Sequence, residues 1–276
     1  MAEKKITNPY RPVKAEVIEV IPETPTIKTI RFKPEEPIEF LSGQFVEITV
    51  PGVGEAPFTP SSNPAQKDIM EVTIMKVGKV TDKVHDLKKG DVIGVRGPLG
   101  TAYPIDEFEG REVVVIGGGC GFAPLRSLMY EFFNRSGKFK KLYFRGGCKT
   151  PKEMVYRSET DEWAKRDDLD LRLTVDHGDD KWKGNVGVVT TIFDDIRVDC
   201  KEAIAVVCGP PIMMKFATLK LLDMGFQEDN IYLSMEKNMS CGIGKCGHCR
   251  LGTYYACKDG PVFQYSKIKG FHGIWD

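Results

Sequence analysis

The 276-residue sequence has no excess of either charge and no long apolar run. Its 39 basic and 39 acidic residues cancel, so charge gives no reason to expect binding to nucleic acid or to an anionic membrane surface. No stretch approaches the roughly 20 apolar residues that span a bilayer. The polar start MAEKKITNPY also lacks the apolar segment of a signal peptide. We therefore expect a cytoplasmic protein without a membrane span.

Several motifs of hydrolytic enzymes are also missing. The sequence contains no GxSxG, HExxH or Walker A pattern, which leaves serine hydrolases, zinc peptidases and P-loop nucleotidases without support. It has no internal repeats and no low-complexity linkers. The length corresponds to about two domains of ordinary size.

Eight cysteines are present, and they fall into two groups. Cys120, Cys148, Cys200 and Cys208 are scattered through segments that read as folded, which favours reduced thiols over a disulfide framework. The other four stand together near the C-terminus in the segment CGIGKCGHCRLGTYYAC. They are Cys241, Cys246, Cys249 and Cys257.

The spacing Cx4Cx2Cx7C of this second group predicts an iron–sulfur site. The opening Cx4Cx2C is the cysteine spacing of plant-type [2Fe–2S] proteins, whereas bacterial [4Fe–4S] motifs use Cx2Cx2C and end in Cys-Pro. Gly242, Gly244 and Gly247 allow the backbone to turn its N–H groups toward the sulfurs. Structural zinc is the alternative, with His248 as a spare ligand, but zinc knuckles usually pair two Cx2C units and only one is present.

The N-terminal third alternates apolar and polar residues in short runs, as in AEVIEVI, TIKTIRF, QFVEITV, MEVTIMKV and DVIGVRG. This alternation predicts antiparallel strands, and the recurring Gly and Pro turn signals suggest a small β-barrel. After Tyr103 apolar runs alternate with helical stretches, with one helix expected near VVTTIFDDI. That pattern predicts a parallel sheet with crossover helices.

Two strand ends in the second half carry possible binding residues. VVVIGGGCGFAPLRSLM reads as a buried strand, a glycine turn from Gly119 to Pro124, and a helix. Such a junction suits a pyrophosphate, although the third glycine of the Rossmann fingerprint and its acidic partner are missing. In AIAVVCGPPIMM, Cys208 precedes Gly209 and Pro210 at the carboxyl end of a strand, where ligands bind in open α/β sheets. The alternative is that Cys208 is an ordinary buried thiol.

Together, GGGCGFAP, CGPPIM and the four-cysteine segment, preceded by a barrel, resemble the ferredoxin–NADP reductase superfamily. The chain looks most like the flavin and [2Fe–2S] subunits of multisubunit anaerobic enzymes. These include the sulfhydrogenase gamma subunit, the corresponding flavin subunit of anaerobic sulfite reductase, the dihydroorotate dehydrogenase B electron-transfer subunit and the small subunit of NADH-dependent ferredoxin–NADP oxidoreductase. The resemblance implies three segments: an FAD-binding antiparallel β-barrel (1–105), an NAD(P)-binding α/β domain (106–228) and a small [2Fe–2S] module (229–276).

The resemblance also implies roles for individual residues. The flavin motif Arg-x-Tyr-Ser falls on APFT. Phe58 would stack on the flavin, and Thr59 would hydrogen-bond near its reactive edge. Ala56 stands where the family has arginine. The second flavin motif, Gly-x-x-Ser/Thr, falls on Gly78 and Thr81, with Lys76 or Lys79 as a substitute positive charge. The remaining implied site residues are Gly119, Gly121, Pro124, Gly209 and Pro210 near the nicotinamide nucleotide, and Cys208 beside the nicotinamide and the flavin.

These cofactors imply electron transfer rather than acid–base catalysis. A nicotinamide delivers electrons in pairs, a [2Fe–2S] cluster carries one at a time, and FAD joins the two. The sequence contains no recognisable site for a terminal substrate, so we expect a hetero-oligomer with catalytic and iron–sulfur partner subunits.

Arg145 and Lys149 either bind a 2′-phosphate or belong to a solvated surface, so the choice between NAD and NADP is left open. The tail SKIKGFHGIWD either anchors a partner or folds on its own domain. A regulatory subunit that binds nucleotide and metal without turnover is the second hypothesis.

Overall fold

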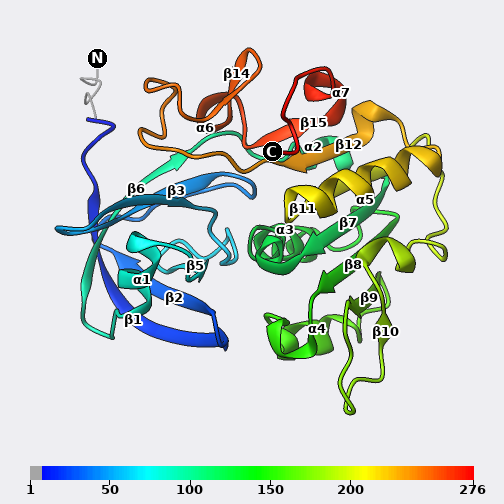
Figure 1. The fold of residues 1–276 in the computed structure, drawn as a ribbon, viewed down its shortest axis with the longest axis horizontal. Coiled ribbons are helices and arrows are strands. Elements are labelled where there is room, and N and C mark those ends of the chain that lie inside the picture. The colour runs from blue at the N-terminus through cyan, green and yellow to red at the C-terminus, as the bar shows by residue number, and fades with distance from the viewer. Residues whose placement is uncertain (1–7) are drawn as a thin grey trace.

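The computed structural model describes residues 8–276. The first seven residues, part of the polar start used to predict the location, lie outside the described residues. Two sheets organise the chain, and the C-terminal segment lies across both (Figure 1). In residues 8–276 no helix is long and apolar enough to cross a membrane.

The first sheet is antiparallel, with the strand order β4-β3-β6-β1-β2-β5. A backbone bridge between Pro60 and Val72, and a 2.8 Å hydrogen bond from the Ser61 N–H to the Glu71 carbonyl, join its two edges. The sheet therefore closes into the expected barrel. Its elements are β1 (Val13–Thr24), β2 (Ile27–Pro34), β3 (Phe45–Val50), β4 (Gly54–Phe58), β5 (Met70–Met75), α1 (Lys79–His85) and β6 (Val92–Leu99).

The second sheet has the order β10-β9-β8-β7-β11-β12-β15 and is parallel except for β15, which pairs antiparallel to β12. This arrangement confirms the predicted α/β fold. Its strands are β7 (Glu112–Gly118), β8 (Lys141–Cys148), β9 (Leu169–Val175), β10 (Asn185–Val186), β11 (Ile204–Cys208), β12 (Ile231–Ser234) and β15 (Val262–Gln264). The helices that accompany it are α2 (Ile105–Phe108), α3 (Phe122–Asn134), α4 (Arg157–Trp163) and α5 (Pro211–Asp223).

The prediction of a helix near VVTTIFDDI was wrong, because the segment does not form an α-helix. Only a 3-10 turn forms there, from Val189 to Ile192. Four consecutive β-branched residues, VTTI, lose side-chain freedom in a helix and so disfavour one. Three further 3-10 turns are Gly119–Gly121, Pro151–Glu153 and Glu228–Asn230.

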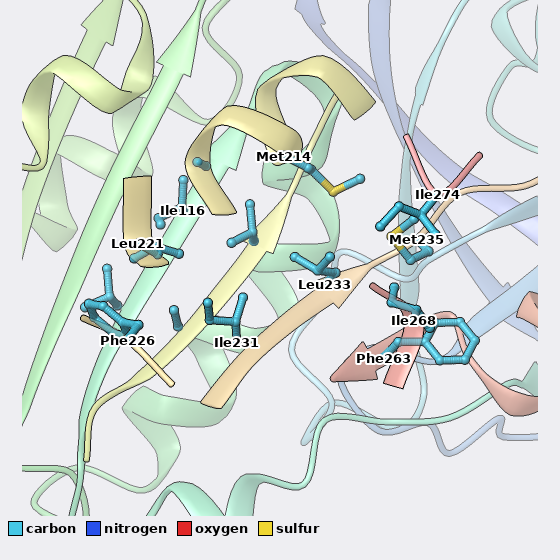
Figure 2. Packing of buried hydrophobic residues seen from close by; sticks show 14 of the residues in the cluster. Ile116, Met214, Leu221, Phe226, Ile231, Leu233, Met235, Phe263, Ile268 and Ile274 are labelled. Atoms are coloured by element: carbon cyan, nitrogen blue, oxygen red, sulfur yellow. The ribbon is translucent and has the colours of Figure 1, made fainter. Parts of the chain in front are cut away.

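The unbroken apolar run of β7 is explained by burial on both faces of the sheet. Val113 and Val115 belong to the core that packs under α3, whereas Val114 and Ile116 belong to the core under α5. Figure 2 shows this second core, in which Leu221 of α5 lies near Ile116 and the cluster continues to Phe263 and Ile274. Strands covered on both sides need no polar alternation.

The C-terminal segment combines sheet strands with a small separate hairpin. The hairpin is β13 (Arg250–Leu251) with β14 (Tyr254–Tyr255), followed by α6 (Ala256–Asp259) and α7 (Tyr265–Ile268). Both β12 and β15 lie after residue 228, yet they extend the nucleotide-domain sheet. The proposed boundary at 229 therefore does not coincide with an edge of this sheet, and the three-domain division stays a prediction.

The tail folds on its own domain. Ile274 is buried, the Trp275 ring stacks on Tyr265 with 6.3 Å between centroids, and Phe271 packs edge-on against Tyr254. Lys237 Nζ also donates to the Gly273 carbonyl at 3.1 Å. These contacts favour the second of the two expectations for the tail.

The packing of α5 gives a stability prediction. Leu221→Ala should lower the free energy of unfolding by about 2–5 kcal/mol because this fully buried side chain would leave a cavity. Leu219→Ala on the same helix should change it by less than about 0.5 kcal/mol, since Leu219 is 44% exposed. Urea unfolding of both variants would measure the difference. Equal losses would show that α5 does not pack as described.

Candidate functional site

A cleft of about 1650 Å³ lies between the barrel and the second sheet. The barrel contributes Phe58, Thr59, Thr73 and Thr81 to its lining. The nucleotide-domain sheet contributes residues at the carboxyl ends of its strands, where open α/β sheets bind ligands. The predicted residues among them are Gly119, Gly121, Pro124, Cys208, Gly209 and Pro210.

The segment predicted to hold the flavin begins at an edge of the barrel sheet. β4 is an edge strand that ends at Phe58, and both Phe58 and Thr59 are half-buried at the cleft wall. An edge strand tolerates Pro57, which cannot donate a backbone hydrogen bond. Phe58 is therefore available to a ligand on one side while its other side packs against the barrel core.

The Thr81 hydroxyl is already engaged with the backbone. It accepts hydrogen bonds from the N–H groups of Val77 and Gly78, both at 2.9 Å, and donates to the Gly78 carbonyl at 2.9 Å. Thr81 thus fixes the turn that starts α1. Val77 and Thr81 line the cleft, whereas Gly78 and the exposed Lys76 and Lys79 are absent from its lining. A hydroxyl bond from Thr81 to a diphosphate would therefore have to replace one of these backbone contacts.

The glycine loop after β7 contacts the end of β11 directly. A Cβ placed on Gly121 would lie 2.3 Å from the Cys208 carbonyl oxygen, so this position accepts no side chain. Gly119 has a φ of +53°, in the left-handed region that glycine adopts without strain. The two predicted strand-end motifs therefore form one surface of the cleft.

Two thiols and one carboxyl lie close together on that surface. Burial, with a smaller contribution from the charge of Glu236, raises the pKa of Cys120 to about 11 and raises the pKa of Cys208 further. Burial also raises the pKa of Glu236, although its side chain opens toward the cleft. Both thiols are consequently neutral at physiological pH. Cys208 can pack against a ligand but is not a thiolate nucleophile.

Of the two residues expected to bind a 2′-phosphate, only Lys149 lies at the cleft. Arg145 is fully buried and bonds to Asp170 and Asp195 at 3.1 and 3.2 Å, so it does not face the cleft. The expectation for Arg145 was wrong because a buried guanidinium requires carboxylate partners of its own. Lys149 does line the cleft, together with Asp176 at the end of β9.

The four C-terminal cysteines lie around a loop whose N–H groups point at sulfur. Lys245 and Cys246 donate to Cys241 Sγ at 3.2 and 3.4 Å, and Gly244 donates to Cys257 Sγ at 3.0 Å. Burial alone would raise the pKa of Cys241, but the backbone N–H groups of Ile243, Cys246 and Lys245 lower it to about 6. The donor set fits thiolate ligands of an iron–sulfur cluster.

The four cysteines of the loop differ in their exposure to solvent. Cys249 Sγ and Cys257 Sγ are 3.1 Å apart and buried, whereas Cys246 is exposed. In the described part of the chain no three His, Cys, Asp or Glu side chains converge as around a single ion. Four thiolates shared between two irons do not require such convergence.

The cysteine loop is attached to the barrel by a buried arginine. Arg96 of β6 donates to the Cys241 carbonyl at 3.0 Å and to Glu55 at 2.7 Å. Glu47 beside it is buried, and its Oε1 near Gly242 accepts no hydrogen bond, although it lies 4.0 Å from Arg96 Nη2. Burial, followed by the charge of Glu55, raises the pKa of Glu47 to about 7 against the opposing effect of Arg96.

Comparison with known families assigns each part of the chain. Residues 14–103 match an oxidoreductase FAD-binding domain, residues 115–218 an oxidoreductase NAD-binding domain, and residues 236–269 the iron–sulfur cluster binding domain of dihydroorotate dehydrogenase B. The sulfhydrogenase 1 gamma subunit of Pyrococcus furiosus is 36% identical over 98% of this chain and 96% of its own length. A probable dihydroorotate dehydrogenase B electron transfer subunit of Methanocaldococcus jannaschii is 34% identical, covering 94% and 92%.

The chain belongs to this family of electron-transfer subunits, within the ferredoxin–NADP reductase superfamily. Among solved structures, the NADH-dependent reduced ferredoxin–NADP oxidoreductase superposes with a TM-score of 0.74 at 27% identity, covering 92% of this chain and 91% of that chain. The cytochrome b5 reductase domain of Ulva prolifera nitrate reductase has a TM-score of 0.70 at 22% identity, covering 82% and 98%, and shares the fold.

The family assignment settles the reaction class. This protein is an NAD(P)H-dependent flavin oxidoreductase subunit that transfers electrons and has FAD-binding, NAD-binding and iron–sulfur binding domains. Iron–sulfur binding is therefore favoured over the zinc alternative. The roles of individual residues in the cleft stay predictions.

Sequence reasoning missed two parts of the site. Glu236 follows β12 and faces the cleft beside Cys208, and its position just after a parallel strand was the available signal. Arg126 and Tyr156 join the two domains next to the cleft, but nothing local in the sequence distinguishes them from other buried residues of helical segments.

The Gly121 contact can be tested by adding one methyl group. Gly121→Ala should lower the free energy of unfolding by about 1–3 kcal/mol, because its Cβ would collide with a backbone oxygen that cannot move away cheaply. Gly270→Ala is the control, since nothing lies within 4 Å of a Cβ there. If thermal and urea unfolding show both variants unchanged, the loop does not contact β11 as described.

The charge of Glu236 should control the reactivity of Cys120. Because a nearby anion disfavours the thiolate, Glu236→Gln should lower the pKa of Cys120 and raise its alkylation rate at pH 9 by roughly two- to fivefold. Alkylation of Cys148, whose pKa is raised by burial and by Glu153 and Asp176, should not change. Glu153→Gln is the matched control and should accelerate Cys148 only. Mass spectrometry of each labelled peptide would measure both rates.

Proposed function

We propose that this subunit exchanges hydride between NAD(P)H and FAD in the cleft. It then passes single electrons through a [2Fe–2S] cluster at Cys241, Cys246, Cys249 and Cys257 to or from a partner catalytic subunit. In this arrangement Phe58 and Thr59 hold the flavin, Thr81 and the turn at Gly78 support it, and Gly119 to Pro124 with Cys208 to Pro210 hold the nicotinamide nucleotide.

One observation carries this proposal: the cleft and the cysteine loop adjoin. Met239 lines the cleft, and Cys241 follows two residues later. Arg96 ties the Cys241 carbonyl to the same barrel that bears Phe58. A flavin in the cleft and a cluster on the loop would therefore be held by one connected piece of structure.

The bound groups supply the redox chemistry, since FAD takes two electrons with a hydride and gives them up singly. The protein positions these groups and keeps neighbouring side chains neutral. Cys208 and Cys120 stay protonated beside the flavin and nicotinamide positions, which leaves no thiolate to attack either ring.

The lining of the cleft favours NADH over NADPH. Asp176 lies at the end of β9, where a carboxylate can accept hydrogen bonds from ribose hydroxyls and repels a 2′-phosphate. Arg145, one of the two basic residues expected to bind such a phosphate, is buried in ion pairs. Of these two expected residues only Lys149 lines the cleft, to which Lys220 and Lys237 also contribute.

The exposed side of the cysteine loop suits a protein partner. Cys246 is the exposed member of the four cysteines, so the cluster edge it holds would face outward. From Lys237 to Lys258 the sequence contains Lys245 and Arg250 as well, and no acidic residue. We infer a partner with an acidic face that carries its own redox centre, such as a hydrogenase, a sulfite reductase or a related iron–sulfur subunit. The cytoplasmic location stays a prediction.

A regulatory subunit without turnover is the second candidate, and Ala56 is the observation that favours it. Neither Lys76 nor Lys79 lines the cleft to replace the missing arginine. Cofactor content separates the two proposals, because a regulatory chain would purify without FAD.

The first experiment is anaerobic purification with flavin and metal analysis, followed by EPR after addition of NADH or NADPH. We expect about one FAD and two irons per chain, and a [2Fe–2S] signal that appears faster with NADH than with NADPH. Zinc in place of iron, or absence of flavin, would exclude the electron-transfer mechanism.

Removal of one thiolate should abolish the cluster without removing the flavin. Cys257→Ala is expected to lose iron and the EPR signal while NADH still bleaches the flavin absorption, because the cluster lies beyond the flavin on the path. Cys200→Ala, which removes a half-buried cysteine outside the loop, is the control and should retain both. Iron and acid-labile sulfide analysis would measure the loss.

A further inference from the structure

The two domains that form the cleft contact each other along α3. Ser127 Oγ on this helix lies 3.1 Å from Ser42 Oγ of the barrel domain, and Asn134 Nδ2 donates to Asn63 Oδ1 at 2.8 Å. Arg126, which directly precedes Ser127, is the centre of a third contact made by charged and aromatic residues. We call Arg126, Glu71, Glu159 and Tyr156 the Arg126 clamp.

Arg126 connects both domains through hydrogen bonds of its guanidinium. On the nucleotide-domain side it bonds both oxygens of Glu159, with Nε–Oε2 at 2.9 Å and Nη2–Oε1 at 2.7 Å. On the barrel side Nη1 donates to Glu71 of β5 and, at 3.1 Å, to the Ser61 carbonyl. The Arg126 side chain is only 9% exposed.

The two carboxylates of the clamp are balanced by Arg126 together with Arg31, which lies outside the clamp and also pairs with Glu71. Burial would raise the pKa of Glu71, but Arg126 and Arg31 hold it below its ordinary value. Arg126 in turn has a raised pKa because Glu159, Tyr156 and Glu71 outweigh its own burial. A guanidinium suits this position because its planar fork bonds both oxygens of Glu159 in a fixed geometry while a further N–H group reaches Glu71. A lysine ammonium presents its three donors from a single atom and has no such fork.

Tyr156 makes a second connection between the domains. It has a φ of 55°, the only positive φ at a non-glycine residue among residues 8–276, and its ring lies 4.7 Å from the Arg126 guanidinium carbon. Its hydroxyl donates to Thr73 Oγ1 of β5. Thr73 lines the cleft and also bonds Ser61 Oγ at 3.1 Å.

The clamp therefore holds both halves of the proposed hydride-transfer site. Ser61 follows Thr59 by two residues in the flavin segment, and Arg126 lies in the second turn of the helix that starts after the Gly119–Gly121 loop. Each half lies in a different domain. The distance between a bound flavin and a bound nicotinamide thus depends on how these domains are oriented.

We propose that the Arg126 clamp is a positioning device that fixes the angle between the barrel and the nucleotide domain, and so controls hydride transfer rather than cofactor affinity. The inference rests on the proposed function, because it assumes FAD and NADH in the cleft. In the step concerned, one hydride leaves the nicotinamide of NADH and both of its electrons reach FAD. A misplacement of about 1 Å can slow such a transfer about 100-fold.

The test compares Arg126→Gln, Arg126→Lys and Tyr156→Phe with Arg166→Gln as the matched control. Arg166 is also an arginine in an ion pair, but its partner Asp168, at 2.8 Å, lies in the same domain. Stopped-flow reduction of the FAD-loaded protein by NADH separates the limiting rate from the apparent Kd. We expect the limiting rate to fall about 10- to 100-fold in Arg126→Gln and less in Arg126→Lys and Tyr156→Phe. The apparent Kd and FAD content should stay within about threefold, and Arg166→Gln should behave as wild type.

Amide hydrogen exchange of the nucleotide-free protein gives a readout independent of turnover. Residues 59–62 and β5 should exchange faster in Arg126→Gln and Tyr156→Phe, and not in Arg166→Gln, whose ion pair with Asp168 lies within the nucleotide domain. Unchanged limiting rates in Arg126→Gln, or a rate loss explained by loss of FAD or NADH binding, would overturn the proposal. If Arg126→Gln does not fold, Tyr156→Phe decides, and a full rate in that variant overturns it.

Failure of the proposed function gives a different result. In that case NADH would not reduce even the wild-type flavin. The exchange measurement would then still decide whether the clamp couples the two domains, since faster exchange in the two clamp variants supports the coupling and unchanged exchange excludes it.

Discussion

The contact of α3 with the barrel is the constraint on which the site depends. One end of this helix begins at the glycine loop, and its length lies against the barrel through Ser127, Arg126 and Asn134. The apolar face of α3 packs on β7 and β11, so the helix is held by the sheet and its polar side chains set where the barrel sits. The cleft is the space left between the two domains at the end of this contact.

The eight cysteines show how environment divides one residue type between two chemistries. In the cleft, burial and the nearby carboxylate of Glu236 keep Cys120 and Cys208 as neutral thiols. In the C-terminal loop, backbone N–H groups converge on Cys241 and favour its thiolate. Thiolates bind metal and neutral thiols do not, so hydrogen bonding prepares Cys241 as a ligand. It does not do so for every cysteine of the loop, because burial and the neighbouring Cys249 raise the pKa of Cys257.

The alternation of residue types predicted both sheets correctly, and the cysteine spacing with the family resemblance predicted the cofactor classes correctly. Local patterns sufficed because strand alternation, the glycine turns and the cysteine intervals are properties of neighbouring residues. The helix expected over VVTTIFDDI failed because its β-branched residues outweighed the pattern. Arg145 failed for another reason, since its buried position depends on Asp170 and Asp195, which are distant in sequence.

The sequence by itself determined the kinds of parts: a flavin barrel, a nucleotide-binding sheet and a four-cysteine loop. Each is encoded by residues a few positions apart, whose spacing is fixed by the covalent chain. Only the tertiary structure decided how these parts meet. The bonds from Arg96 to the Cys241 carbonyl and from Arg126 to Glu71 join residues 145 and 55 positions apart. Such partners are selected by the packing of whole domains, which no local pattern records.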